Sequence, residues 1–100
     1  MNSKEKIYAV LNMIPAGKVI SYGQLASLAG LPRAARLAGA ILGQLPKDTS
    51  LPWHRVIKAN GRIAFDEGSP AFKRQKQRLL DEGIAVADGR IKLSQFGWHP

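Results

Sequence analysis

Two short helical segments separated by a glycine and a proline restrict this chain to folds that contain a helical corner. Ser21 and Gln24 have the spacing of a capping box, so we expect a helix to begin at about Tyr22. Gly30 suits a left-handed stop to that helix, and Pro32 suits the first turn of the next one. The order helix, three-residue turn, helix predicts a helix-turn-helix, a corner found in DNA-binding proteins and also in folds that bind no DNA.

The second helix, predicted over about residues 33 to 45, has two different faces. Apolar residues at core-facing spacing form one stripe: Ala34, Leu37, Ala38, Ile41 and Leu45. The opposite stripe carries one arginine among very small residues: Arg36, Gly39, Ala40 and Gly43. Because glycine inside a helix costs about 1 kcal/mol relative to alanine, this bare face predicts close contact with something large and flat. Tight packing against another helix is the alternative explanation.

Two further helices are expected on either side of this pair. Apolar periodicity predicts a helix over residues 4 to 14, with Ser3 as its cap. Ser69-Pro70 is a good cap and first-turn pair for a later helix that ends at Glu82, before Gly83. The wet side of that later helix carries a run of positive charge: Lys73, Arg74, Lys76 and Arg78. Such a run is usually only a solvated face, but here it adds to the basic surface of the chain.

Asparagine-glycine and aspartate-glycine pairs predict the β structure. Asn60-Gly61 predicts a hairpin between residues 56–58 and 62–65, and Asp88-Gly89 predicts a second, weaker hairpin within residues 84–93. The predicted fold class is therefore mainly α with small β hairpins (α+β), arranged as a winged helix-turn-helix.

Charge gives the first indication of a partner. The chain has 15 Lys and Arg against 7 Asp and Glu, a formal charge of +8 at pH 7. In so small a protein this excess favours a polyanionic partner, with nucleic acid ahead of a membrane surface because no basic amphipathic helix is obvious. A soluble protein that is merely basic is the alternative.

The chain contains no cysteine, which excludes disulfides, thiolate metal sites and every thiol nucleophile. Its two histidines, His54 and His99, do not make a convincing metal site, so neither metal nor cofactor is expected. No apolar run reaches the roughly 18 to 20 residues of a membrane span, and the start of the chain lacks the apolar core of a signal peptide. We expect a monomeric cytoplasmic protein, associated with the nucleoid if bacterial, with a single domain over residues 1–100.

Four motifs, in this order, are similar to motifs of one known family. They are Tyr22-Gly23-Gln24-Leu25-Ala26, Ala34-Ala35-Arg36-Leu37-Ala38-Gly39, Pro52-Trp53-His54-Arg55-Val56-Ile57 and Leu79-Leu80-Asp81-Glu82-Gly83. Over roughly residues 4 to 83 the chain resembles the C-terminal, DNA-binding domain of the O(6)-alkylguanine-DNA alkyltransferases. That family implies a helix-turn-helix in the minor groove and a Pro-Cys-His-Arg motif whose cysteine accepts the alkyl group.

Trp53 stands where the resemblance places the acceptor cysteine. Indole nitrogen is a donor without a usable lone pair, so we expect no alkyl transfer and no enzyme activity. The chain is therefore similar to the alkyltransferase-like branch of the family. That branch implies binding of O(6)-alkylguanine in double-stranded DNA by base flipping, and recruitment of nucleotide excision repair proteins.

The resemblance also implies three groups of site residues. Residues expected to bind DNA, with Arg36 filling the space of the flipped nucleotide and Tyr22 turning the neighbouring phosphate, are Tyr22, Arg33, Ala34, Ala35, Arg36 and Gly39. Residues expected at the lesion pocket are Tyr22, Trp53 and Val56. The remnant of the catalytic relay, Trp53, His54 and Glu82, has no nucleophile, and residues given a structural role are His54, Arg55 and Glu82.

One departure from the family and several alternatives stay open at this point. The loop that should cover the flipped base falls near residues 63–69 and contains Asp66 and Glu67, acidic residues that are unexpected beside phosphates. A winged-helix transcription regulator would need base-reading polar side chains on the second helix, where the chain has glycine and alanine. A glycosylase-like hydrolase would have only His54 and Glu82 for its chemistry. Trp53 could be an ordinary core residue, and a plain interaction domain would leave the charge without a use.

Overall fold

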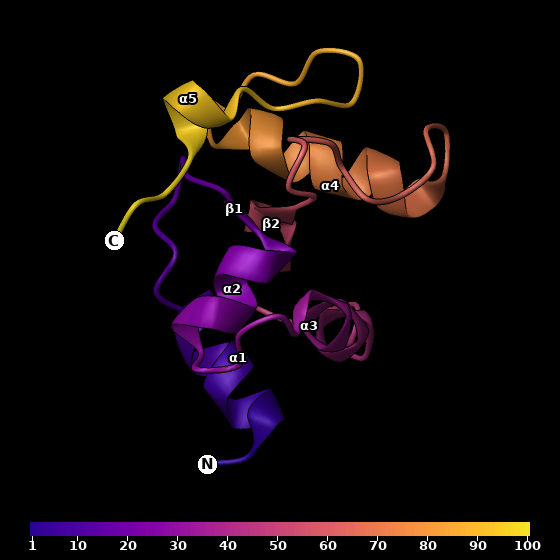
Figure 1. Ribbon diagram of the computed structural model, residues 1–100. Coiled ribbons are helices and arrows are strands. Elements are labelled where there is room, and N and C mark those ends of the chain that lie inside the picture. The colour runs from indigo at the N-terminus through magenta and orange to yellow at the C-terminus, as the bar shows by residue number, and fades with distance from the viewer.

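The computed structural model describes residues 1–100 and is mainly helical, as predicted (Figure 1). In chain order its elements are α1 (Ser3–Leu11), β1 (Ile20–Ser21), α2 (Tyr22–Leu28), α3 (Ala35–Gly43), a 3-10 turn η1 (Trp53–Arg55), β2 (Val56–Ile57), α4 (Pro70–Asp81) and α5 (Leu93–Phe96).

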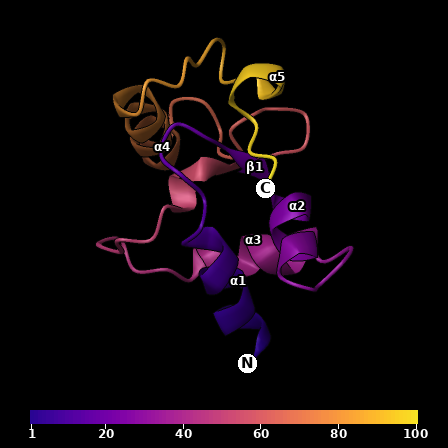
Figure 2. The same cartoon turned by 90° about the vertical axis from the view of Figure 1, so that its left-hand side faces the viewer.

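A two-stranded parallel sheet separates the two halves of the molecule. β1 pairs with β2 in the register Ile20 to Val56 and Ser21 to Ile57. Because alternate side chains point to opposite faces, Ile20 and Val56 join the core formed with α1, α2 and α3, whereas Ile57 joins the core under α4. Both views show α1, α2 and α3 on one side of the strands and α4 and α5 on the other (Figures 1 and 2). The sheet therefore fixes the position of the helical corner relative to α4.

The predicted start of α2 is confirmed, whereas the prediction for α1 needs correction. Ser21 caps α2 and forms the expected capping box with Gln24. In α1 the cap is Asn2, which forms a capping box with Glu5, and not Ser3. An asparagine oxygen accepts the backbone N–H of Glu5 at 2.8 Å, so the helix begins one residue before the predicted range. It also ends earlier, at Leu11.

The turn before α3 is longer than the three residues predicted. Gly30 has the expected left-handed backbone, with φ of 77°. Pro32 lies in the turn and not in the first turn of α3, and Arg33 also has a positive φ, of 64°. Helical geometry therefore begins only at Ala35. Leu37, predicted to face the core, is 42% exposed, and the residues that α3 buries are Ala38 and Ile41.

The first predicted hairpin does not form, although its turn does. Gly61 has φ of 87° and donates to the carbonyl of Lys58 at 2.9 Å. After the turn the chain leaves β2, and Ile63 instead donates to the carbonyl of Gly89 at 2.9 Å. A Cβ at residue 61 would lie 2.7 Å from the carbonyl oxygen of Ile91, so this crossing requires glycine. β2 therefore pairs in parallel with β1 and not, as the hairpin prediction required, with residues 62–65.

The second predicted hairpin is a tight turn, and α4 is as expected. Ala87 and Arg90 exchange both backbone hydrogen bonds around Asp88 and Gly89, which both have positive φ. Ser69 caps α4 with Pro70 in its first turn. Sequence reasoning missed α5, a single helical turn near the C-terminal end of the chain.

Candidate nucleic-acid interface

The bare stripe of α3 is open on the surface of this chain. Arg36, Ala40 and Gly43 are exposed, and Gly39 is half-buried. A Cβ at Gly39 would meet the ring of Tyr22 at 3.8 Å, an ordinary contact, and one at Gly43 would meet nothing within 4 Å. The ring of Tyr22, at the start of α2, lies against Gly39, but Ala40 and Gly43 are open, so intrachain helix packing does not explain the small size of those two residues.

The turn that leads into α3 places the other predicted DNA-binding residues beside Arg36. Arg33 is exposed, and Ala34 and Ala35 are half-buried. No side chain caps the first turn of α3, so its leading backbone N–H groups have no side-chain acceptor. Such groups bind anions well, and the small side chains of Ala34 and Ala35 leave them accessible.

Tyr22 begins α2 and lies against the middle of α3, at Gly39. Its side chain is half-buried beside the core of the helical corner. Burial raises the pKa of the Tyr22 hydroxyl above its usual value of 10.0. The hydroxyl is therefore protonated at neutral pH and can donate a hydrogen bond to an anion.

Trp53 is half-buried at the start of η1, with its ring edge-on to two neighbouring rings. The ring centroids of Trp53 and His54 are 6.1 Å apart, and those of Trp53 and Phe65 are 6.4 Å apart. On another side, the guanidinium carbon of Arg78 lies 5.4 Å from the Trp53 centroid, a cation–π contact. Trp53 is therefore held in place by its neighbours while part of its ring stays accessible.

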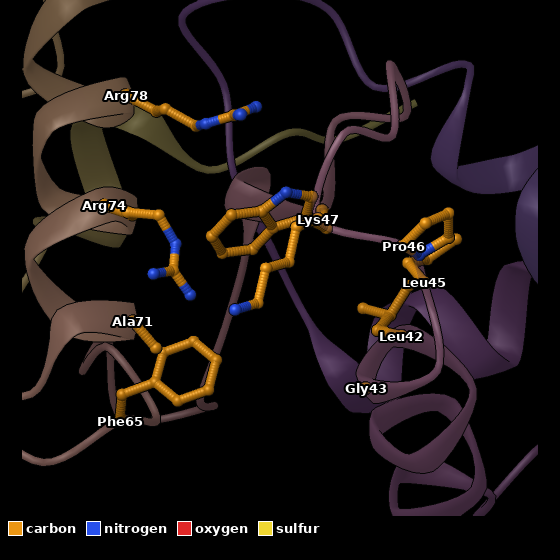
Figure 3. A pocket seen from close by; sticks show the side chains of 10 residues that line it. Leu42, Gly43, Leu45, Pro46, Lys47, Phe65, Ala71, Arg74 and Arg78 are labelled. Carbon is orange, nitrogen blue, oxygen red and sulfur yellow. The ribbon is translucent and has the colours of Figure 1, made fainter.

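Trp53 lines a cavity of about 290 Å³ between the end of α3 and α4 (Figure 3). This volume is near the lower end of the roughly 300–1,000 Å³ usual for small-ligand sites. The lining combines an apolar wall with basic side chains: Leu42, Gly43, Leu45, Pro46, Lys47, Trp53, Phe65, Ala71, Arg74 and Arg78. Gly43 belongs both to this lining and to the bare stripe of α3, so the stripe runs from Arg36 to the edge of the cavity.

Of the three residues predicted at the lesion pocket, only Trp53 lines this cavity. Val56 has no exposed surface, because β2 points its side chain into the core, so its placement at the pocket needs correction. Tyr22 lies against α3 and is not among the lining residues. Phe65 shows that the loop over residues 63–69 does reach the cavity, whereas Asp66 and Glu67 are exposed and do not line it.

Sequence reasoning missed the basic side of the cavity. Lys47, Arg74 and Arg78 all line it. The sequence places Arg74 and Arg78 only in the general basic surface, but their spacing of four residues puts them on one side of α4, together with Ala71. The spacing of Ala71, Arg74 and Arg78 by three and four residues is the sequence signal that could have placed both arginines on one face.

A three-residue hydrogen-bond cluster lies behind Trp53. Nε2 of His54 lies 2.6 Å from Oε2 of Glu82, and Arg55 donates to both carboxylate oxygens at 2.8 to 3.1 Å. The backbone N–H of Gly17 also donates to Glu82, at 2.9 Å, and Arg55 donates to the carbonyl of Ile14 at 2.7 Å. These hydrogen bonds tie η1 to the end of α4 and to the segment after α1.

The protonation of this cluster follows from its contacts. Burial raises the pKa of the Glu82 carboxyl, but hydrogen bonds from Arg55, Gly17 and His54 outweigh it and lower the pKa from 4.5 to about 2. Burial lowers the pKa of His54, although Glu82 opposes this shift. Nδ1 of His54 is buried without a partner, so a second proton there would lack an acceptor. His54 is therefore neutral and donates from Nε2 to the Glu82 carboxylate.

Two further observations concern clustered metal ligands and membrane-spanning helices. No group of three or more His, Cys, Asp or Glu side chains is placed to hold a metal ion. None of the helices has the length and apolar character that crossing a membrane requires.

Comparison with known proteins identifies the family. The model described as "6-O-methylguanine DNA methyltransferase, DNA binding domain" matches residues 2–84. The DNA base-flipping protein of Escherichia coli (strain K12) is 42% identical over 96 residues, which cover 95% of this chain and 73% of that protein. Alkyltransferase-like protein 1 of Schizosaccharomyces pombe is 36% identical over 100 residues, which cover 95% of this chain and 93% of that protein.

A solved structure confirms the predicted fold class. The crystal structure of S. pombe Atl1 in complex with damaged DNA containing O6-carboxymethylguanine superposes with a TM-score of 0.90 at 35% identity, covering 97% of this chain and 94% of that one. The chain therefore belongs to the 6-O-methylguanine DNA methyltransferase family, through its DNA-binding domain, and carries Trp53 in the Pro-Trp-His-Arg motif where the resemblance places the acceptor cysteine.

Proposed function

We propose that this protein binds O(6)-alkylguanine in double-stranded DNA, turns the damaged base out of the helix and holds it without repairing it. The observation that carries the proposal is the continuity of the bare stripe of α3 with the cavity at Trp53, through Gly43. Arg36 stands seven residues before Gly43, two helical turns or about 10 Å along the axis. One short helix thus carries the arginine that enters the duplex and, at its other end, reaches the edge of the cavity that receives the base.

The energetics agree with this division of roles. Turning a base out of the duplex costs a few kcal/mol, which the inserted Arg36 and the contacts of the cavity must offset. The exposed, side-chain-poor face of α3 allows close approach to the minor groove. Tyr22, protonated and next to Gly39, can donate to the phosphate beside the flipped nucleotide. Trp53 offers an aromatic surface beside the extruded purine.

The relatives support the same activity. Their names describe base flipping and an alkyltransferase-like protein, and one of them has been solved with damaged DNA. A sequence-reading transcription regulator is disfavoured because α3 presents glycine and alanine where polar base-reading side chains would be needed.

No alkyl group is transferred to this chain, because it contains no cysteine. Glu82 is hydrogen-bonded to both His54 and Arg55, and we give His54 and Glu82 a structural role. Mass analysis of protein and alkylated duplex after incubation should find both unchanged. Release of the base would instead support the glycosylase-like alternative.

The lesion complex acts as a signal in this proposal. A protein that binds damage without removing it is useful only if other proteins respond, and nucleotide excision repair proteins are the proposed partners. The protein binds as a monomer in this proposal, since Arg36 and all the residues that line the cavity belong to one copy of the chain.

Fluorescence anisotropy tests the proposal with two duplexes that differ by one O(6)-methylguanine. Salt is held constant, because phosphate contacts alone make affinity steeply salt dependent. We expect tighter binding of the damaged duplex, and a reduced preference in Arg36→Ala. Equal binding of both duplexes by the wild type would refute the proposal and favour a regulator that reads sequence.

A further inference from the structure

The cavity at Trp53 is lined by three basic side chains and no acidic one. Lys47 comes from the loop after α3, and Arg74 and Arg78 come from α4. Arg74 and Lys47 project into the space between α4 and the end of α3, opposite the apolar side chains of Leu42 and Leu45 (Figure 3). The cations therefore approach the cavity from two separate elements.

None of these cations has a carboxylate partner. The chain contains two ion pairs, and both use Glu82, with His54 and with Arg55. Asp48 and Asp66 directly follow the cavity residues Lys47 and Phe65, but both are exposed and neither forms an ion pair. Two other acidic residues have different neighbours. Oε1 of Glu67 lies beside Gly89, and Oδ1 of Asp81 accepts a hydrogen bond from Gln77 at 2.8 Å.

The surroundings combine apolar surface with unpaired cations. Leu42, Leu45, Pro46 and Phe65 form an apolar wall on one side of the cavity, beside the basic side chains. Charge-assisted hydrogen bonds are stronger than neutral ones, and a guanidinium binds a carboxylate with two parallel hydrogen bonds. Arg78 is half-buried and held against the Trp53 ring, so its head group loses little freedom on binding.

We infer that this cavity favours O(6)-substituents that carry a negative charge, with Arg74, Arg78 and Lys47 as the residues that determine the preference. The inference rests on the proposed function, because it requires the damaged guanine to enter this cavity. An anionic group on the O(6) atom would lie between the apolar wall and the basic side chains. A neutral group of the same size would have the same apolar contacts without the charge-assisted hydrogen bonds.

The test uses four duplexes of one sequence, in competition anisotropy at constant salt. They contain guanine, O(6)-methylguanine, O(6)-carboxymethylguanine or the neutral amide of the carboxymethyl group, which has nearly the same shape. The variants are Arg74→Gln and Arg78→Gln, with Lys73→Gln as the matched control. Lys73 is exposed on the same helix and does not line the cavity, and its substitution by glutamine removes one positive charge, as each arginine variant does.

We expect the wild type to bind the carboxylate about tenfold more tightly than the amide. Each arginine variant should lower this ratio by about threefold, while Lys73→Gln leaves the ratio unchanged. If the arginine variants weaken all four duplexes equally, the cations bind only DNA phosphates and the inference is wrong. An equal affinity of the wild type for carboxylate and amide would also overturn it.

Failure of the inference can be distinguished from failure of the proposed function. If the wild type prefers O(6)-methylguanine to guanine but does not prefer the carboxylate to the amide, only the inferred charge selectivity is refuted. Equal binding of all four duplexes would instead refute the proposed binding of the lesion itself. Thermal melting of each variant shows that Arg78→Gln, which loses its contact with Trp53, is folded in the assay; Arg74→Gln gives the same test at a side chain with no such contact.

Discussion

Nε2 of His54 lies 2.6 Å from Oε2 of Glu82, a hydrogen bond that, with Trp53 in the cysteine position, has no nucleophile to activate. The same carboxylate accepts hydrogen bonds from Arg55 and from the backbone of Gly17. The hydrogen bond of a proton relay is therefore present without a nucleophile. In this chain it helps to join η1, the end of α4 and the segment after α1. Its contribution should be visible as stability and not as catalysis.

The stability of the fold should fall in acid because of Glu82. Its pKa is lowered from 4.5 to about 2 in the folded protein, so its contribution is fully present above pH 4.5 and is lost as the pH falls toward 2. We expect a loss of about 2 kcal/mol in the free energy of unfolding, with allowance for solvent screening. Urea denaturation at several pH values measures it.

Glu82→Gln should be less stable at neutral pH and should lose less stability between pH 4.5 and 2 than the wild type. Glu67→Gln, at an exposed position, serves as the control and should follow the wild type. An unchanged acid profile in Glu82→Gln would show that other groups cause the acid sensitivity. His54, whose pKa is lowered by burial, adds a loss of stability below its usual value of 6.5, because the unfolded state then binds the proton more readily.

Gln75 should be required to hold the segment that carries Trp53. Its buried side chain donates to the carbonyls of His54 and Val56, each at 3.0 Å. Gln75→Met keeps the volume but leaves both buried carbonyls without this donor, so we expect a loss of about 2 kcal/mol in the free energy of unfolding. Gln77→Met, at an exposed position of the same helix, should cost much less. Equal effects in urea denaturation would mean that the two hydrogen bonds contribute no net stability.

The bare stripe of α3 should tolerate a larger side chain in the free protein but not in the DNA complex. Ala40 is exposed in the middle of the stripe, so Ala40→Leu should leave the melting temperature nearly unchanged. Close approach of α3 to the minor groove would be blocked, and we expect about tenfold weaker binding to damaged duplex. Ala9→Leu, on the exposed side of α1, should bind as the wild type does. Normal binding by Ala40→Leu would exclude this stripe as the contact surface.

Local chemistry explains which elements could be predicted from sequence. The capping box of Ser21 and Gln24, the cap at Ser69 and the left-handed stop at Gly30 are set by neighbouring residues, and all three are present. Parallel pairing of β1 with β2 could not be predicted, because it joins distant segments and leaves no local signal. Asn60-Gly61 correctly predicts a turn, but the strand that pairs with β2 comes from a distant segment and not from the residues after the turn.

The same difference between local and long-range features applies to the residues of the site. Arg36 and the bare stripe were predictable because the spacing of the small residues is a property of one helix. The cavity is formed between α3 and α4, so the inward direction of Arg74 and Arg78 depends on how those helices are placed. The family resemblance implies a pocket position for Val56, but strand geometry turns its side chain into the core.

The most direct test of the central claim is to observe the base leaving the duplex. A fluorescent cytosine analogue, pyrrolocytosine, placed opposite a single O(6)-methylguanine becomes brighter when its partner no longer stacks and pairs with it. At saturating protein, the wild type should raise its fluorescence on the damaged duplex much more than on the undamaged one, and Arg36→Ala should raise it less. Saturated binding by the wild type with no change in fluorescence would show that the lesion stays in the helix and would contradict the account.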